Sequence, residues 1–310
     1  MFYEIGYFDN QQIFHFSTSY VSSNRAGRLV EFVGRFFRFV RHLVQVKPDA
    51  IFVMSNSYLG FYEKCFYCII ARLFGVRSML NHVGGEFDKF YRKNWLTKFL
   101  VRIFVRFPNA LLIGSTYWCN YFRSSFPKVT VYSVPNPIIA DQYKNTNTRT
   151  ETSSRFVITS LFRLVKEKGV YEMLTVIKSM CSQFENVEFV IIGGGPMLND
   201  VYQALETDIK RGNVRVLGFV DDTTKIKEIC ACDVYMMLTH FDLMPISIME
   251  AMSASKPVLT TRVGGIPEMV EDGLNGFLFE VGETEEVVTK LNILIKQRDV
   301  GKAMGKKGRE

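Results

Sequence analysis

Two cations five residues apart, Arg163 and Lys168, directly follow a strand-like apolar run. Loops after the strands of open parallel sheets are where ligands bind, so this pair lies where an anion site is expected. Arginine can hold a diphosphate through two parallel hydrogen bonds, and lysine acts on it as a point charge. Because Lys166 and Glu167 stand between them, a solvated charged turn is an equally good interpretation.

A second group of candidate residues lies between Asp242 and Glu250. Pro245 fits the first turn of a helix, where its missing N–H costs nothing. The free amides of Ile246 and Ser247 would then form a positive helix end that suits a phosphate. The carboxylates of Asp242, before the helix, and Glu250, on it, could accept hydrogen bonds from sugar hydroxyls.

A glycine-rich turn, Gly193-Gly194-Gly195, follows an apolar run at residues 187–192. Glycines at this place let the backbone approach a ligand or form a tight turn. A lone glycine run does not separate the two, so a ligand-binding loop and a plain strand-to-helix turn both stay open.

Short apolar runs that alternate with helical patterns must position these residues. Such alternation predicts parallel strands covered by helices. We expect an α/β protein with two doubly wound, Rossmann-like domains that face each other across a cleft, at residues 1–140 and 155–310. A polar segment without periodicity, residues 141–154, is the expected linker. The expected strands lie at residues 50–54, 78–83, 110–114 and 129–134, and at 156–162, 187–192, 214–220, 234–239, 257–261 and 276–279.

The charge of the 310-residue chain is concentrated in its first half: residues 1–140 hold 17 Lys and Arg against 7 Asp and Glu. This excess suggests an anionic partner such as a membrane surface, a lipid phosphate or an acidic glycan. Nucleic acid is not expected, because the cations alternate with Phe and Leu and form no reading motif.

Residues 25–47 combine cations such as Arg35 and Arg38 with phenylalanines such as Phe36 and Phe39. A basic amphipathic helix here could lie on an anionic membrane and reach a lipid-linked glycan. The alternative is a helix that covers the sheet, with its aromatic side chains in the core and its cations in water. No signal peptide or span-length apolar run is visible, so we expect a cytoplasmic protein, with possible peripheral contact on the inner face of the membrane.

The six cysteines are scattered along the chain. Cys65 and Cys68 have a zinc-like spacing, but no second pair completes a site, so we expect small buried side chains instead. Since no Asp-x-Asp pair occurs, a metal-bridged diphosphate would lack its usual ligands, and neither a metal nor a cofactor is expected.

Several motifs between about residues 155 and 280 appear in order and with compatible spacings. Together they resemble glycosyltransferase group 1, a retaining family of the GT-B type. Fainter matches in the first half are Lys47-Pro48-Asp49 and Gly84-Gly85-Glu86-Phe87. The motifs of the second half are Arg163-Leu164, Lys168-Gly169, Gly193-Gly194-Gly195-Pro196, Gly218-Phe219-Val220, Asp233, Pro245, Glu250-Ala251-Met252, Lys256-Pro257-Val258, Gly264-Gly265-Ile266-Pro267-Glu268 and Asn275-Gly276.

The resemblance implies a role for each charged candidate. Arg163 and Lys168 would bind the donor diphosphate and stabilise the leaving nucleotide. Glu250 matches the second glutamate of the family's paired-glutamate motif and would hold the ribose hydroxyls. Asp242 stands where the first glutamate contacts the donor sugar, and it is shorter by one methylene.

The resemblance also implies donor contacts from backbone and turns. The amides of Ile246 and Ser247, behind Pro245, would cradle the distal phosphate. Base recognition is expected from the glycine-containing loops around residues 193 and 218. The candidates there are Gly194, Gly195 and Phe219.

Two departures from the family pattern concern the first half. The family often has His-Gly before an acidic-aromatic pair, whereas here His82 stands one place early, in Asn81-His82-Val83-Gly84. His82 is a catalytic candidate, with a structural histidine as the alternative. The family's first glycine-rich turn is not visible in residues 1–24, and the chain stops inside a helical pattern at residues 300–310, so we expect a fragment that lacks both ends.

The resulting prediction is a metal-independent, retaining glycosyltransferase of polysaccharide or glycolipid biosynthesis. It would move a sugar from a UDP-, GDP- or ADP-sugar to a glycan or lipid-linked acceptor. One alternative is a catalytically impaired sugar-nucleotide-binding or scaffolding subunit. Another is a nucleotide-sugar epimerase, for which His240 is the extra acid–base candidate in the second domain.

Overall fold

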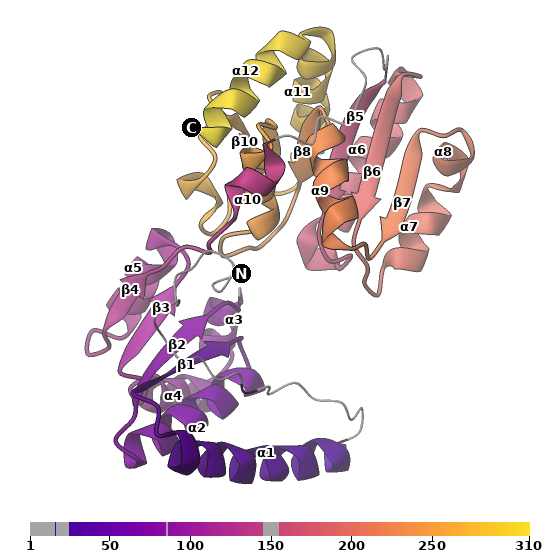
Figure 1. Cartoon of the computed structure of the whole chain (residues 1–310). Coiled ribbons are helices and arrows are strands. Elements are labelled where there is room, and N and C mark those ends of the chain that lie inside the picture. Colours follow the sequence, from indigo (N-terminus) through magenta and orange to yellow (C-terminus); the bar gives the residue numbers. More distant parts are fainter. Residues whose placement is uncertain (1–15, 17–24, 85, 145–154) are drawn as a thin grey trace. The chain divides into compact units, whose positions relative to one another are not determined.

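The computed structural model describes residues 16, 25–84, 86–144 and 155–310 (Figure 1). The chain divides into two compact units, Met1–Pro137 and Ile138–Glu310. Each unit has one parallel sheet with helices between its strands, which confirms the α/β class. The boundary falls three residues before the expected end of the first domain, and the expected linker positions 145–154 lie outside the described residues.

The described part of the first unit is a four-stranded parallel sheet in the order β1-β2-β3-β4. All four strands lie where the apolar runs predict them, and the described strands add to the sheet in one direction only. The elements are α1 (Arg25–Val46), β1 (Ala50–Ser55), α2 (Leu59–Leu73), β2 (Arg77–His82), α3 (Phe87–Arg92), α4 (Trp95–Phe104), β3 (Ala110–Ile113), α5 (Thr116–Ser125) and β4 (Val131–Ser133).

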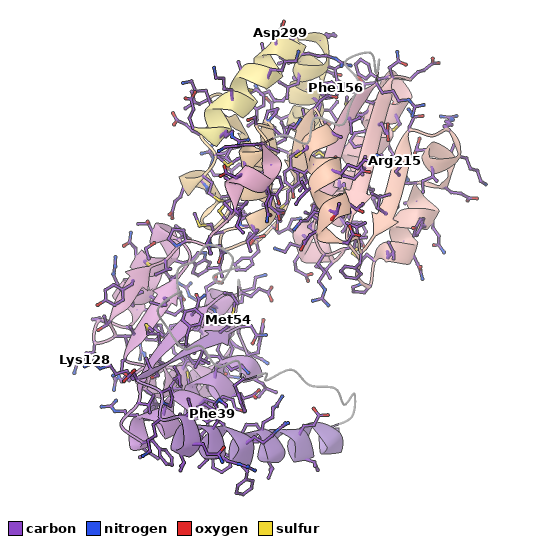
Figure 2. All side chains as sticks on the ribbon, viewed as in Figure 1. Phe39, Met54, Lys128, Phe156, Arg215 and Asp299 are labelled. Atoms are coloured by element: carbon purple, nitrogen blue, oxygen red, sulfur yellow. The ribbon has the colours of Figure 1, made fainter. Side chains whose placement is uncertain are left out.

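Helix α1 covers α2 through long aromatic side chains. The Phe39 ring, labelled in Figure 2, lies 4.8 Å from that of Tyr67, centroid to centroid. On the same helix, however, Arg35 is only 2% exposed, and its guanidinium lies 3.3 Å from the Glu63 carboxylate. Arg38 is exposed. The expectation of aromatics in the core and cations in water therefore holds for part of the helix, with Arg35 as a buried cation and Phe37 as an exposed aromatic residue.

The second unit has a doubly wound, six-stranded parallel sheet in the order β10-β9-β8-β5-β6-β7. The chain builds outward from β5 to β7 and then returns to β8 beside β5, which makes this neighbouring pair the topological switch point. Its strands are β5 (Phe156–Leu161), β6 (Val187–Ile192), β7 (Val214–Gly218), β8 (Val234–Met237), β9 (Val258–Thr261) and β10 (Gly276–Phe279).

The helices of the second unit pack on this sheet around a core that is mostly aliphatic and sulfur-containing, with some buried aromatic rings such as Phe189 and Tyr235. Strands β8 and β9 are buried along their whole length, as expected for central parallel strands. The remaining elements are η1 (Ala140–Tyr143), η2 (Lys166–Lys168), α6 (Val170–Gln183), α7 (Leu198–Ala204), α8 (Glu206–Lys210), α9 (Asp222–Ala231), α10 (Ile246–Ser253), η3 (Ile266–Glu268), α11 (Thr284–Lys296) and α12 (Arg298–Arg309).

Cys65 and Cys68 both lie on α2 and are fully buried, and all six cysteines are free thiols. Burial raises the pKa of the Cys68 thiol to about 12, so it stays protonated. This placement fits small apolar core residues. Among the described helices, none combines the length and apolar composition needed to cross a bilayer.

Candidate functional site

The charged candidates of the second unit gather at the carboxyl edge of its sheet. Because all six strands are parallel, their ends lie along one edge, and β5 and β8 are adjacent there. Arg163 and Lys168 follow β5, and Asp242 follows β8 in the loop that leads into α10. The topology thus brings two segments about eighty residues apart to the switch point, where ligands bind in such sheets.

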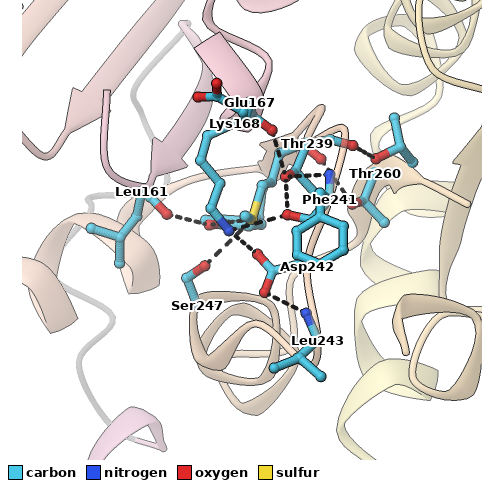
Figure 3. A network of polar contacts seen from close by, with 12 residues as sticks. Leu161, Glu167, Lys168, Thr239, Phe241, Asp242, Leu243, Ser247 and Thr260 are labelled. Carbon is cyan, nitrogen blue, oxygen red and sulfur yellow. Dashed lines mark hydrogen bonds and ion pairs between the residues drawn. The ribbon is translucent and has the colours of Figure 1, made fainter. Parts of the chain in front are cut away.

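Lys168 and Asp242 form an ion pair with each other (Figure 3). The Lys168 ammonium also donates to the Phe241 carbonyl at 3.3 Å, and the second carboxylate oxygen of Asp242 accepts from the Leu243 amide at 2.9 Å. The two side chains are 27% and 15% exposed. A diphosphate at Lys168 would therefore compete with Asp242 for the ammonium.

Hydrogen bonds tie the loop after β8 to the turn η2 (Figure 3). The Thr239 hydroxyl donates to the Phe241 carbonyl at 2.9 Å, and the His240 amide donates to the Glu167 carbonyl at 3.0 Å. The His240 ring lies 2.7 Å from a Glu172 carboxylate oxygen. These bonds hold the loops that carry Lys168 and Asp242, and they engage the histidine that an epimerase would use.

Arg163 differs from Lys168 in its surroundings. Its side chain is exposed, and no described residue makes a hydrogen bond or ion pair with its guanidinium. Its carbonyl accepts from the Val165 amide at 2.8 Å, which shapes the turn that follows β5. Of the two predicted clamp residues, Arg163 is thus available to an anion, and Lys168 is already paired.

Helix α10 begins at Ile246, and Pro245 is its N-cap with φ −68° and ψ 122°. The sequence predicted that Pro245 lies in the first turn of the helix, whereas in the structure it lies just before that turn. No side chain caps this helix end. The Ser247 hydroxyl lies 3.7 Å from the sulfur of Met237, in the interior. What Ile246 and Ser247 offer an anion is thus their backbone amides.

Glu250 is only 6% exposed, and two donors meet on the same carboxylate oxygen. Its Oε1 accepts from the Tyr143 hydroxyl at 2.9 Å and from the Lys225 ammonium at 2.8 Å. Lys225 also lies 2.9 Å from Asp222. Burial lowers the pKa of Lys225, but the hydrogen bonds to Glu250 and Asp222 outweigh it and raise that pKa overall. No described residue is bonded to Oε2.

Tyr143 and Lys225 are site residues that the sequence reasoning missed. Tyr143 lies in the segment interpreted as linker, yet it is buried in the second unit as part of η1. Burial and the neighbouring Glu250 raise the pKa of its hydroxyl, so the hydroxyl stays a donor. A single aromatic residue in an otherwise polar segment was the signal that could have revealed it.

The glycine turn after β6 owes its composition to three close approaches, of which the closest would put a Cβ on Gly193 2.0 Å from the Phe162 carbonyl oxygen. Gly195 has φ +158°, and a Cβ there would lie 2.4 Å from the Leu164 carbonyl oxygen. A Cβ on Gly194 would lie 2.4 Å from the Phe219 ring. Phe219 itself is 85% exposed. The turn thus packs against the loop after β5, and it leaves an aromatic ring free on its outer side.

His82 lies in the first unit and is 1% exposed. Its Nδ1 is 3.1 Å from the Ser55 hydroxyl, and its ring packs 4.9 Å from that of Phe87 and 5.8 Å from that of Phe122. Burial lowers its pKa to about 4, so the imidazole is neutral at pH 7. This setting favours the structural alternative for His82.

The second unit matches the model of a known protein family. The family model for glycosyl transferases group 1 matches residues 142–310. A curated relative, the phosphatidylinositol N-acetylglucosaminyltransferase GPI3 subunit of Saccharomyces cerevisiae, is 26% identical over 182 residues, which are 57% of this chain and 40% of that protein. The chain therefore spans about two fifths of the length of this relative.

Two solved structures share the fold. Sucrose-phosphate synthase from Thermosynechococcus elongatus superposes with a TM-score of 0.76 at 13% identity, covering 94% of this chain and 75% of that one. HepE from Anabaena, solved in complex with UDP-glucose, superposes with a TM-score of 0.70 at 19% identity. The superposition covers 87% of this chain and 76% of that one. Both likenesses support the GT-B fold.

Proposed function

The chain belongs to the glycosyl transferases group 1, and from this premise we propose that it is a retaining glycosyltransferase that uses a nucleotide-diphosphate sugar without a metal ion. The observation that carries the proposal is the available cation Arg163 at the same sheet edge as Lys168 and the uncapped end of α10. Three sources of positive charge around one edge suit a diphosphate.

These groups would stabilise the leaving diphosphate as its charge develops. Arg163 provides two parallel donors, and Lys168 provides a point charge. The backbone amides of Ile246 and Ser247 donate from the positive end of the helix. Preorganised donors of this kind lower the barrier because they need no reorganisation during the reaction. In this way protein groups would take the place of a metal ion.

Asp242 would exchange partners when the donor binds. Without a ligand it neutralises Lys168. A bound diphosphate would draw the ammonium away and leave one carboxylate oxygen to accept from a hydroxyl of the donor sugar. The Leu243 amide, 2.9 Å from the other oxygen, would keep the side chain in place meanwhile.

Glu250 and Phe219 would hold the nucleoside. Because Tyr143 and Lys225 both occupy Oε1 of Glu250, Oε2 keeps its lone pairs for the two ribose hydroxyls. The exposed Phe219 ring offers a face on which a base could stack. UDP, GDP and ADP are the nucleotides to compare.

We propose a glycan or lipid-linked acceptor in polysaccharide or glycolipid biosynthesis, met at the cytoplasmic face of a membrane. Two observations support it. The first unit carries the chain's excess of basic residues, and the yeast relative is named as a phosphatidylinositol N-acetylglucosaminyltransferase subunit.

The test is a calorimetric titration with UDP, GDP and ADP, without metal. One diphosphate should bind, and its affinity should fall at least tenfold in Arg163→Ala and in Glu250→Gln. Lys210→Ala is the matched control, because Lys210 is an exposed cation on α8 whose one ion pair among the described residues is with its helix neighbour Glu206. If none of the three binds, or if both variants bind as well as the control, the donor site is wrong.

Turnover assays then separate the reaction classes. Transfer of the sugar to an acceptor supports the proposal. Binding without transfer to any glycan or lipid-linked acceptor would indicate a scaffolding subunit. Conversion of the donor alone would indicate an epimerase, in which the pair His240 and Glu172 would be the first residues to vary.

A further inference from the structure

Helix α4 presents large apolar side chains on its outer surface. Trp95 is 79% exposed, Phe99 56%, Leu96 48% and Ile103 37%. Their spacing places them on one face of the helix, about 100° wide. The opposite face carries Val101, which is fully buried in the first unit. Trp95, Leu96, Phe99 and Ile103 are called the α4 face below.

Cations border the α4 face. Lys98 and Arg102 are exposed and lie one turn apart along its flank, and the exposed Arg106 follows in the turn after the helix. The Arg102 guanidinium donates to the Tyr91 hydroxyl at 2.9 Å, which fixes its direction. Around them, residues 89–140 contain eight Lys and Arg and not one Asp or Glu. An exposed apolar face thus lies within a long stretch of purely positive charge.

We propose that the α4 face docks the protein on an anionic lipid bilayer, with α4 lying in the headgroup layer. Tryptophan favours this layer, since its ring is apolar and its N–H is polar. Ten residues of helix measure about 15 Å, half the thickness of the hydrocarbon core, so α4 lies on the membrane and does not cross it. The flanking cations complement the negative surface of anionic lipids.

A bilayer fits this face better than a protein partner does. Exposed apolar groups of this size on a soluble surface indicate an interaction site. Protein interfaces are depleted in lysine, whereas a helix rich in Lys and Arg beside Trp and Phe is typical of interfacial binding. The location differs from the one expected from sequence, because α1 turns several of its aromatic residues onto α2.

Tryptophan emission tests the proposal directly. The chain has two tryptophans, and Trp118 is 4% exposed, so a change on membrane contact reports on Trp95. The full chain mixed with phosphatidylcholine–phosphatidylglycerol vesicles should show a blue shift, quenching by brominated lipid, and loss of binding in 0.5 M salt. Vesicles of phosphatidylcholine alone should bind at least tenfold more weakly.

Matched variants locate the surface. The double variant Leu96→Ser/Phe99→Ser should bind anionic vesicles at least tenfold more weakly, whereas Phe37→Ser on α1, a 66% exposed phenylalanine, should stay within twofold of the parent. Equal binding by the double variant, or equal loss in Phe37→Ser, overturns the proposal. The proposal is also overturned if the parent protein forms a concentration-dependent dimer that the double variant does not form, because the α4 face would then bind a second copy.

If the double variant misfolds, quenching of Trp95 emission by brominated lipid in the parent protein still tests the proposal. The proposal supports a lipid-linked acceptor, yet its test involves no nucleotide. Failure of vesicle binding with intact diphosphate binding would reject the α4 face and leave the donor site standing, and the reverse result would reject only the donor site.

Discussion

At the scale of single residues, the Glu250 carboxylate is oriented by two donors from different parts of the second unit. Tyr143 comes from η1, just after the boundary between the units, and Lys225 comes from α9. A buried carboxylate needs such partners, because an unpaired charge in this setting is costly. The two donors also decide which oxygen is left for a ligand.

Tyr143→Phe should weaken binding of the preferred nucleoside diphosphate. The variant removes one donor to Glu250 and keeps the ring in the core, so the carboxylate gains freedom to turn. We expect a loss of about threefold to tenfold, the equivalent of about 1 kcal/mol for one hydrogen bond. Calorimetry measures it, with Tyr202→Phe as control, since the Tyr202 hydroxyl donates to the Val216 carbonyl at 3.2 Å and Tyr202 is 42% exposed. An unchanged affinity in Tyr143→Phe would show that Tyr143 does not orient the Glu250 carboxylate for ligand binding.

Asp242→Asn should separate binding from transfer. It removes the negative charge that neutralises Lys168, so a diphosphate meets an uncompensated cation and should bind about fivefold tighter, close to 1 kcal/mol. Transfer should fall about 100-fold, because the acceptor for a sugar hydroxyl is weakened. Calorimetry and initial rates measure the two effects, with the exposed Asp200→Asn as control. Weaker binding in Asp242→Asn would show that the ion pair does not compete with the ligand.

At the scale of elements, α1 is joined to α2 by aromatic contacts and by one buried ion pair. The rings of Phe36 and Phe66 lie 5.9 Å apart, near the contact between Phe39 and Tyr67. Arg35 reaches through this layer to Glu63. A cation on the inner face of an otherwise amphipathic helix has to be matched by an acid on the element it covers.

Arg35→Ala should destabilise the first unit by about 3 kcal/mol, since it removes a buried cation from the Glu63 carboxylate and leaves the Lys64 ammonium, 3.7 Å away, to balance that charge. Urea unfolding, followed by the emission of the buried Trp118, measures it. Arg38→Ala, one turn along and exposed, should change the unfolding free energy by less than about 0.5 kcal/mol. The double variant Arg35→Met/Glu63→Leu should recover most of the loss, and a cost that persists there would point to packing instead of charge.

At the scale of the whole molecule, the candidate donor site lies entirely within the second unit. Its charged residues, its glycine turns and the orienting Tyr143 all belong to residues 138–310. That unit also has its own continuous core, which includes Tyr143. It therefore has what a chain needs to fold by itself.

A chain of residues 138–310 should unfold cooperatively and bind the preferred nucleoside diphosphate through the same residues as the full chain. A chain of residues 155–310 lacks Tyr143, and it should bind at least threefold more weakly and melt at a lower temperature. Calorimetry and thermal unfolding of the two chains decide this. Equal behaviour would mean that η1 contributes nothing to the second unit.

Much of the architecture followed from local patterns. The strands lie where the apolar runs place them, because a strand buried on both faces of a parallel sheet is mostly apolar, as β8 is along its whole length. The candidate residues Arg163, Lys168 and Asp242 could be named for a similar reason. They stand directly after such runs, and parallel strands end at a common edge.

What the amino-acid sequence determined by itself was therefore the order of elements, the sheet edge that carries the chemistry and the family resemblance. The tertiary structure alone decided which charges meet: Lys168 with Asp242, Arg35 with Glu63, and Glu250 with two donors. The reason is physical. Strand and helix signals act over a few neighbouring residues, whereas these pairs join residues 25 to 107 positions apart, and only the packing of whole elements brings them into contact.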